Sequence, residues 1–192
     1  MKLKAIILTA VILVMSLSAC SAEKISPDAS MEKMCKAFLY LDDKELKDFN
    51  SSSEQLRKIY AGFFENTTGD IKFTNEQANR MADALIEQMR EKIKFSVKTE
   101  SESGDNAVVA VTVTGINFNE TVIDMNFNFD YDNEEQLGEL MTNAVIEQIK
   151  TVKNTPAEVV KFNCNYDKEM NLWIPEGDSE NNLTPLFDAA LK

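Results

Sequence analysis

The sequence contains no histidine among its 192 residues. Ser-His-Asp and Cys-His mechanisms are therefore excluded, and the commonest zinc ligand is absent. Positive charge is also scarce, with 20 Lys and Arg against 32 Asp and Glu. This balance disfavours binding to nucleic acid or direct adsorption to anionic lipid, because both need basic patches. The sequence also lacks a Gly-rich phosphate loop and a Cys-x-x-Cys pair.

The apolar run at the N-terminus is too short for an ordinary membrane span. It covers residues 5–17 and follows a basic segment that contains Lys2 and Lys4. This is the layout of a secretory signal peptide. An ordinary signal peptide with cleavage near Ala22, or an uncleaved anchor, is one interpretation of the segment.

The run ends in Leu17, Ser18, Ala19 and Cys20, and these four residues resemble the lipobox of bacterial lipoproteins. The resemblance implies cleavage between Ala19 and Cys20, with a diacylglyceryl group on the Cys20 thiol and an acylated N-terminus. A thioether requires a soft nucleophile, and small residues before it fit a narrow peptidase cleft. Two or three acyl chains suffice for stable anchoring. We therefore expect a protein anchored in the cell membrane, on its extracytoplasmic face, through lipid on Cys20.

This interpretation divides the chain into a signal peptide (1–19), a lipidated Cys with a tether (20–30) and one domain (31–192). The tether is predicted from small, polar and charged residues around Pro27. Without residues 1–19 the chain has 173 residues, with 18 basic and 32 acidic side chains and a formal charge of −14. This length suits one domain with a sizeable core.

The first half of the domain has a helical pattern. Apolar residues at spacings of three and four predict helices over 31–42, 53–65 and 74–91, with a short helical piece over 44–49. Ser52 with Gln55, and Thr74 with Gln77, form capping-box patterns at two of the starts.

The second half changes to a period of two. Alternation predicts a hairpin of strands near 93–98 and 109–113, a strand over 123–131, and a further pair near 160–166 and 170–174. A helix opened by Asp132 is predicted to interrupt the strands up to about 153, and a last helical turn covers 184–191. The expected fold is α+β, with N-terminal helices packed on a curved, mostly antiparallel sheet of about five strands with one inserted long helix.

The lipobox, the helical first half and two strand ends resemble small lipoproteins of unknown function from Gram-positive bacteria. The strand ends are 113–116 (Val-Thr-Gly-Ile) and 172–174 (Leu-Trp-Ile). The resemblance implies a cone-shaped domain similar to nuclear transport factor 2 and the cystatins. It brings no catalytic residues and no cofactor, and the long inserted helix departs from the simplest cone pattern.

Cys35 and Cys164 are the cysteines that remain once Cys20 is lipidated, and both fall on apolar faces. An extracellular location permits a disulfide between them. The alternative is two buried thiols that pack as small hydrophobes.

An acidic cluster of Asp130, Asp132, Glu134 and Glu135 invites comparison with Ca²⁺ sites. The EF-hand pattern fails, because Glu135 stands where Gly is needed and Met141 stands at the twelfth position. A strand end followed by an acidic helix start, where the carboxylates favour the helix dipole, explains the cluster better than a metal site does. We therefore predict no metal site here.

These observations favour a non-enzymatic binding or interaction module at the cell envelope, with a peptide, cell-wall component or protein as partner and no nucleic acid. The alternative is an enzyme of the cone-shaped superfamily that acts on a small molecule in a pocket lined by Asp and Tyr. Its candidate residues would be Tyr40, Tyr60, Tyr131, Tyr166, Asp124 and Asp130.

Overall fold

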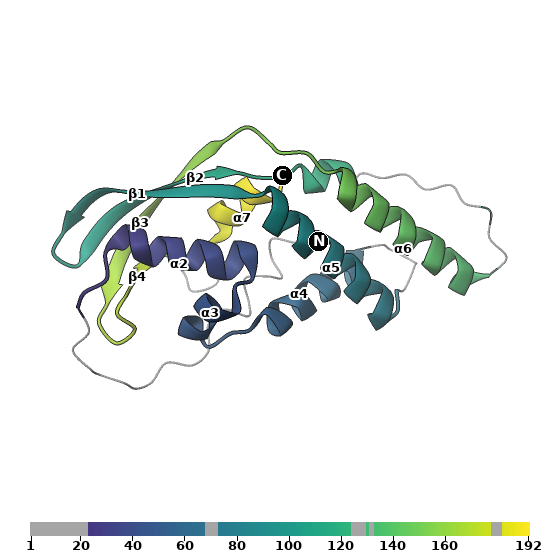
Figure 1. The fold of residues 1–192 in the computed structure, drawn as a ribbon, viewed down its shortest axis with the longest axis horizontal. Coiled ribbons are helices and arrows are strands. Elements are labelled where there is room, and N and C mark those ends of the chain that lie inside the picture. Colours follow the sequence, from purple (N-terminus) through teal and green to yellow (C-terminus); the bar gives the residue numbers. More distant parts are fainter. Residues whose placement is uncertain (1–22, 68–72, 124–129, 131–132, 178–181) are drawn as a thin grey trace.

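The computed structural model describes residues 23–67, 73–123, 130, 133–177 and 182–192. Within them four strands form one antiparallel sheet in the order β1-β2-β3-β4 (Figure 1). The strands are β1 (Lys94–Ser103), β2 (Asn106–Thr114), β3 (Glu158–Asp167) and β4 (Leu172–Pro175). The α+β class is confirmed, with four strands where about five were expected.

The two faces of the sheet differ in polarity. Val111 pairs with Val97 on one side and with Val160 on the other, which places three valines on one face. In the neighbouring row, Lys98 and Lys161 are exposed on the opposite face. The apolar face therefore packs against helices while the other face meets solvent.

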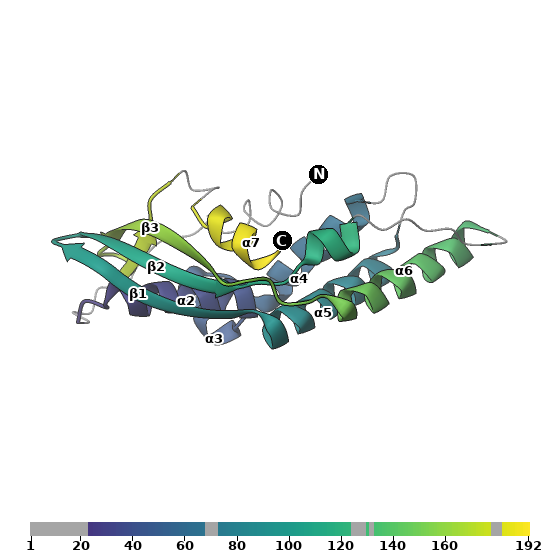
Figure 2. The same cartoon turned by 90° about the horizontal axis from the view of Figure 1, so that it is seen from above.

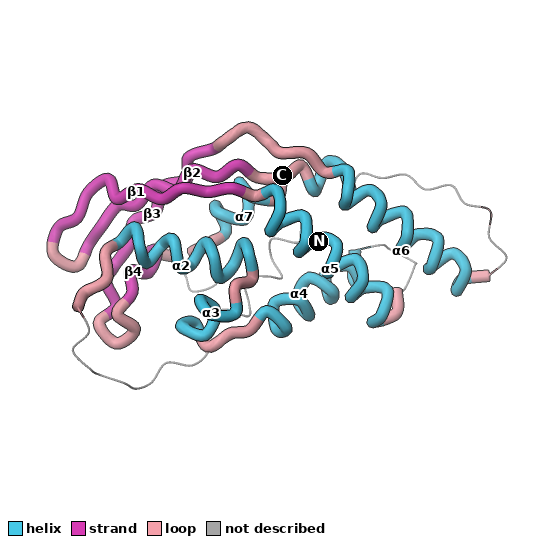
Figure 3. The backbone as a smooth tube through the Cα atoms, in the orientation of Figure 1, coloured by secondary structure: helices cyan, strands magenta, loops and turns pink. Residues whose placement is uncertain are grey.

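Two groups of helices complete the fold. Helix α2 (Pro27–Tyr40) packs against β1, β2 and β4, and α7 (Thr184–Ala190) packs against β2 and β3. Short α3 (Asp43–Leu46) and a 3-10 turn (Lys47–Phe49) lead into α4 (Ser53–Thr67), α5 (Asn75–Lys92) and, later, α6 (Glu134–Thr151). These last three pack side by side and extend the molecule beyond the sheet (Figures 1, 2 and 3).

The predicted capping boxes begin α4 and α5. The Thr74 hydroxyl accepts a hydrogen bond from the Gln77 amide at 3.3 Å, and the Gln77 side chain accepts one from the Thr74 amide at 2.9 Å. Ser52 and Gln55 make the same reciprocal pair. Each box satisfies amides that a helix start would otherwise leave unpaired.

Helix α6 packs on α5 through a polar cluster. Arg80 donates to Glu139 at 2.7 Å and to Asn143 at 2.7 Å. A Cβ at Gly138 would lie 3.3 Å from the Gln77 side chain, so the missing side chain permits the close approach of the two helices.

The predicted strand over 123–131 is not supported where the chain is described. Ile123 ends a π-helical segment (Asn119–Ile123) instead of opening a strand. Most of the predicted strand lies outside the described residues. The alternation of apolar residues with period two therefore predicted the wrong structure at Ile123, the first residue of the expected strand.

Two further boundaries differ from the prediction. The cap of α6 is Asn133, whose side chain accepts from the Gln136 amide, and not Asp132. Residues 27–30 are the first turn of α2, with Pro27 near the helix start, and are not a flexible tether. Proline suits this position because the first helical amides have no intrahelical partner.

Candidate functional site

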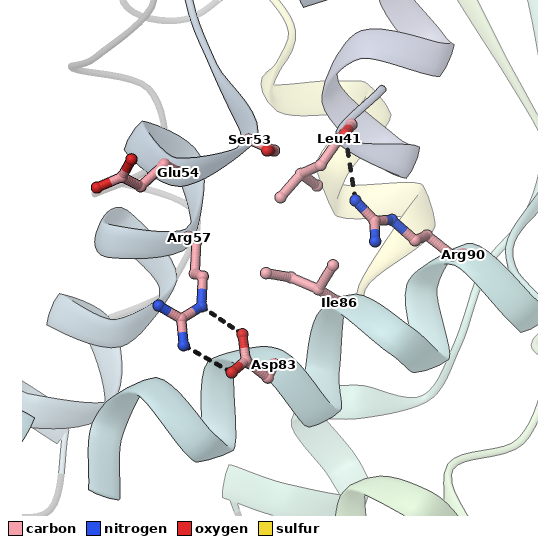
Figure 4. Close-up of a pocket in the computed structure, with 7 residues that line it drawn as sticks. All are labelled: Leu41, Ser53, Glu54, Arg57, Asp83, Ile86 and Arg90. Atoms are coloured by element: carbon pink, nitrogen blue, oxygen red, sulfur yellow. Dashed lines mark hydrogen bonds and ion pairs between the residues drawn. The ribbon is translucent and has the colours of Figure 1, made fainter. Parts of the chain in front are cut away.

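A cleft opens between α4, α5 and the connection from α2 to α3 (Figure 4). Its volume is about 240 Å³. The lining combines two apolar side chains, four charged side chains and one serine: Leu41, Ser53, Glu54, Arg57, Asp83, Ile86 and Arg90.

A salt bridge joins the two helices that line the cleft. Both oxygens of Asp83 accept hydrogen bonds from Arg57, one of them from Nη2 at 2.6 Å. This bond raises the pKa of Arg57. The paired charges lie side by side at the cleft (Figure 4), where a bidentate geometry gives direction as well as attraction.

Arg90 lies across the cleft and caps α2. Its Nε donates to the Tyr40 carbonyl at 2.7 Å and its Nη2 to the Leu41 carbonyl at 3.2 Å. Leu41 has a φ of 50°, the left-handed conformation that ends many helices. Arg90 therefore satisfies carbonyls that the helix end exposes.

The start of α4 forms the remaining wall. Asp43 accepts hydrogen bonds from the Ser53 amide at 2.8 Å and from the Ser53 hydroxyl at 2.9 Å. The bond from the amide is the main reason why the pKa of Asp43 lies below its usual value. Because the Ser53 hydroxyl is held as a donor to a carboxylate, its position is structural.

Together these groups make an amphipathic cleft. Leu41 and Ile86 are both buried, while the carboxylates and guanidinium groups are more exposed. Such a lining suits a ligand that carries an apolar group beside an ionic one. No local sequence pattern indicates this cleft, because its residues come from three separate segments.

The tyrosines proposed for an enzyme occupy structural positions where they are described. Tyr40 donates to the Ile93 carbonyl at 2.9 Å, and Tyr166 donates to Asn171 at 2.5 Å. Tyr60 is buried, and burial raises its pKa. Asp130 is exposed. Tyr131 and Asp124 lie outside the described residues.

The acidic cluster is only partly visible, because Asp132 lies outside the described residues. Glu134 begins α6 and Glu135 is exposed. Within the part of the chain that the structure describes, no group of three or more His, Cys, Asp or Glu side chains is arranged to hold a metal ion.

Cys35 and Cys164 are free, buried thiols in the structure. Cys35 lies on α2, and Cys164 pairs with Ala107 and Pro175 in the sheet. Burial is the main cause that raises the pKa of each thiol to about 12. A disulfide between them stays a prediction.

A second cluster surrounds Lys24, a residue that the sequence analysis assigned to the tether. The Lys24 ammonium lies 4.6 Å from the ring centre of Tyr166 and 4.3 Å from that of Trp173. It also donates to the Gly104 carbonyl at 2.8 Å. In the sequence Lys24 is an isolated lysine, and its partners are distant along the chain, so only the fold could reveal this cluster.

Comparison with known proteins relates the chain to one solved structure. No protein-family model matches the sequence, and no curated protein matches it. The fold is similar to the crystal structure of YcdA, a candidate lipoprotein of Bacillus subtilis subsp. subtilis strain 168, with a TM-score of 0.59 and 14% identity. The match covers 86% of this chain and 56% of that one, so this chain spans little more than half of YcdA.

At 14% identity, this similarity concerns the fold alone: the chain has a fold similar to that of a candidate lipoprotein. The finer resemblance to nuclear transport factor 2 and the cystatins stays a prediction. Among the described residues, no helix is long and apolar enough to span a membrane. The predicted signal peptide and Cys20 lie outside those residues.

Proposed function

We propose that this chain is a lipoprotein anchored through Cys20 on the extracytoplasmic face of the cell membrane, with a domain that binds a partner and has no enzymatic activity. The lipobox from Leu17 to Cys20, at the end of an apolar run, carries this proposal. The fold shared with YcdA supports it.

The cleft between α4 and α5 is the proposed binding site. Its ionic groups already hold one another or cap helices, so they offer fixed charges to a ligand and not a reactive group. Phenylalanine and methionine side chains fill the neighbouring core, including Phe63, Phe118 and Met81. This filling favours recognition at the surface over reaction in a deep pocket. Peptides, cell-wall components and proteins provide the required mixture of apolar and ionic groups.

Replacing the anchor residue tests the first part. In cells fed a clickable fatty acid, the natural chain should become labelled and remain with the membrane fraction. Cys20→Ala should abolish both the label and the membrane retention, because no thiol remains to accept lipid. Cys35→Ala, at a buried thiol, is the matched control and should retain both. Membrane retention of Cys20→Ala after signal processing would contradict the anchor.

Crosslinking on intact cells tests the second part. A photo-crosslinking amino acid in place of Glu54, which lines the cleft, should capture a discrete partner. The same amino acid in place of Glu147, exposed on α6, is the control. The pairing of Arg57 with Asp83 allows a further check, because Arg57→Gln should reduce capture from position 54. Equal capture from both positions would reject the cleft as the binding site.

A further inference from the structure

We infer that one end of the domain faces the lipid bilayer directly. This anchor end consists of residues 23–26, the β1–β2 turn at 104–105 and the β3–β4 turn at 168–171. All three segments lie together at one end of the long axis, opposite the N-terminus of α6 (Figures 1 and 3). The inference rests on the proposed lipid anchor at Cys20 and adds the surface that meets the membrane.

The N-terminal segment is bound to the domain by its backbone. The Ile25 amide donates to Asn171 at 3.3 Å, and the Asn171 side chain donates to the Glu23 carbonyl at 3.2 Å. The Trp173 indole donates to the Ile25 carbonyl at 2.8 Å. Trp173 is itself fully buried, so the segment is attached to a rigid part of the molecule.

Lys24 adds a contact to the second turn. Its ammonium stacks over Tyr166 and Trp173 and reaches the Gly104 carbonyl. Its Nζ also lies 3.4 Å from Asp105, which pairs with Lys168 at 3.1 Å. Cations over aromatic faces are attracted by the electrons of the ring. Lys24 thus links the segment to both turns of the anchor end.

The remaining covalent reach is short. Only Ser21 and Ala22 separate Cys20 from Glu23. A chain extends at most about 3.6 Å per residue, so the Cα atoms of Cys20 and Glu23 are at most about 11 Å apart. Acyl chains on Cys20 must lie in the bilayer, and the domain therefore cannot lift this end far from the headgroups.

Charge attraction does not explain this placement. The anchor end carries Lys24 and Lys168 against a larger set of acidic residues: Glu23, Asp105 and Glu169. An anionic surface would repel it weakly. The covalent connection orients the domain, and helices α4, α5 and α6, with the cleft, then lie farther along the long axis (Figure 1).

Contact quenching on vesicles tests the orientation. The lipidated full chain, with an environment-sensitive fluorescent amino acid in place of Glu169 or Glu135, is placed in phosphatidylcholine vesicles that carry a headgroup quencher. Both positions are exposed, the first at the anchor end and the second on α6. Quenching at position 169 should exceed that at position 135 several-fold. Equal quenching, or stronger quenching at 135, would overturn the orientation.

Two variants test its cause. A 15-residue Gly-Ser linker between Ala22 and Glu23 has an end-to-end distance of about 21 Å, and it should remove the difference between the two positions. Lys24→Ala with Asn171→Gly should reduce quenching at 169, because it releases the N-terminal segment while the fold, checked by circular dichroism, is retained. Persistence of the full difference in either variant would overturn the covalent explanation.

Two more outcomes separate this inference from the proposed function. Failure of the full chain to enter the vesicles would reject the lipid anchor itself. Entry with equal quenching rejects only the orientation. Phosphatidylglycerol added to the vesicles should not increase quenching at 169, whereas an increase would show that electrostatic adsorption, and not the short connection, places this end.

Discussion

Gly115 allows the end of β2 to meet the C-terminal helix. A Cβ there would lie 2.2 Å from the Ala189 carbonyl oxygen and 2.7 Å from that of Ala190. The neighbouring Ile116 amide donates to the Ala190 carbonyl at 2.8 Å, so the two segments are held at this distance. Glycine is required at position 115 because no side chain fits between the two backbone segments.

Gly115→Ala should therefore lower the free energy of unfolding by about 1–3 kcal/mol, because the backbone must move to admit the methyl group. Gly62→Ala in α4 is the matched control, because nothing lies within 4 Å of its Cβ position. That change should raise stability by roughly 0.5–1 kcal/mol through helix propensity. Urea unfolding measures both, and a neutral effect of Gly115→Ala would contradict the close approach.

The two buried cysteines give a second prediction at the scale of the residue. The thiolate is the reactive form, and burial raises the pKa of Cys35 to about 12. In the native protein neither Cys35 nor Cys164 should react with iodoacetamide near neutral pH. In denaturant without reductant, mass spectrometry should find both alkylated, because the structure has both as free thiols.

Alkylation that requires a reductant would instead show the disulfide. The same measurement on Cys164→Ala, where Cys35 has no partner, provides the control. Rapid alkylation of the folded natural chain would contradict the burial of both thiols.

At the scale of the element, the two helix starts with a capping box were predictable from the sequence. The capping boxes of α4 and α5 involve residues three positions apart, and such contacts are determined by local geometry. The cap of α6 was predicted one residue too early, at Asp132 instead of Asn133. Both residue types are good caps, so the sequence could not choose between adjacent positions.

Asn133→Ala should destabilise the protein by about 1 kcal/mol, because the Gln136 amide loses its acceptor. Asp132→Ala should cost clearly less, since Asn133 still supplies the cap. Thermal or urea unfolding of the two variants measures the difference. A greater loss of stability in Asp132→Ala than in Asn133→Ala would show that Asp132 is the cap, as the sequence predicted.

At the scale of the whole molecule, charge affects stability through a set of ion pairs and caps. A hydrogen bond from Lys168 lowers the pKa of Asp105, and one from Arg80 lowers that of Glu139. The ordinary values are 3.8 for Asp and 4.5 for Glu. The folded state therefore binds fewer protons than the unfolded state in this range.

Stability should consequently change little between neutral pH and about pH 5.5 and fall as the pH decreases further through these pKa values. Urea unfolding at a series of pH values between neutral and acid measures the slope. Glu139→Gln should start from a lower stability at neutral pH and lose less on acidification. An unchanged slope in this variant would show that the pair with Arg80 contributes nothing to acid sensitivity.

Most of the helices and strands could be predicted from residues that lie near one another in the chain. Helical spacing, capping boxes and the β1–β2 alternation predicted most elements, because these patterns report local hydrogen bonding and one buried face. The four residues of the lipobox predicted the anchor in the same local way.

The tertiary structure decided what distant residues build. The cleft joins Leu41, Arg57 and Arg90 from separate segments of the chain, and Lys24 contacts Trp173, which is far from it in the sequence. Such contacts depend on how elements pack, which no local pattern records. The sequence alone therefore predicted most elements and the lipid anchor, whereas packing determined the candidate cleft and the arrangement of the end that we propose faces the membrane.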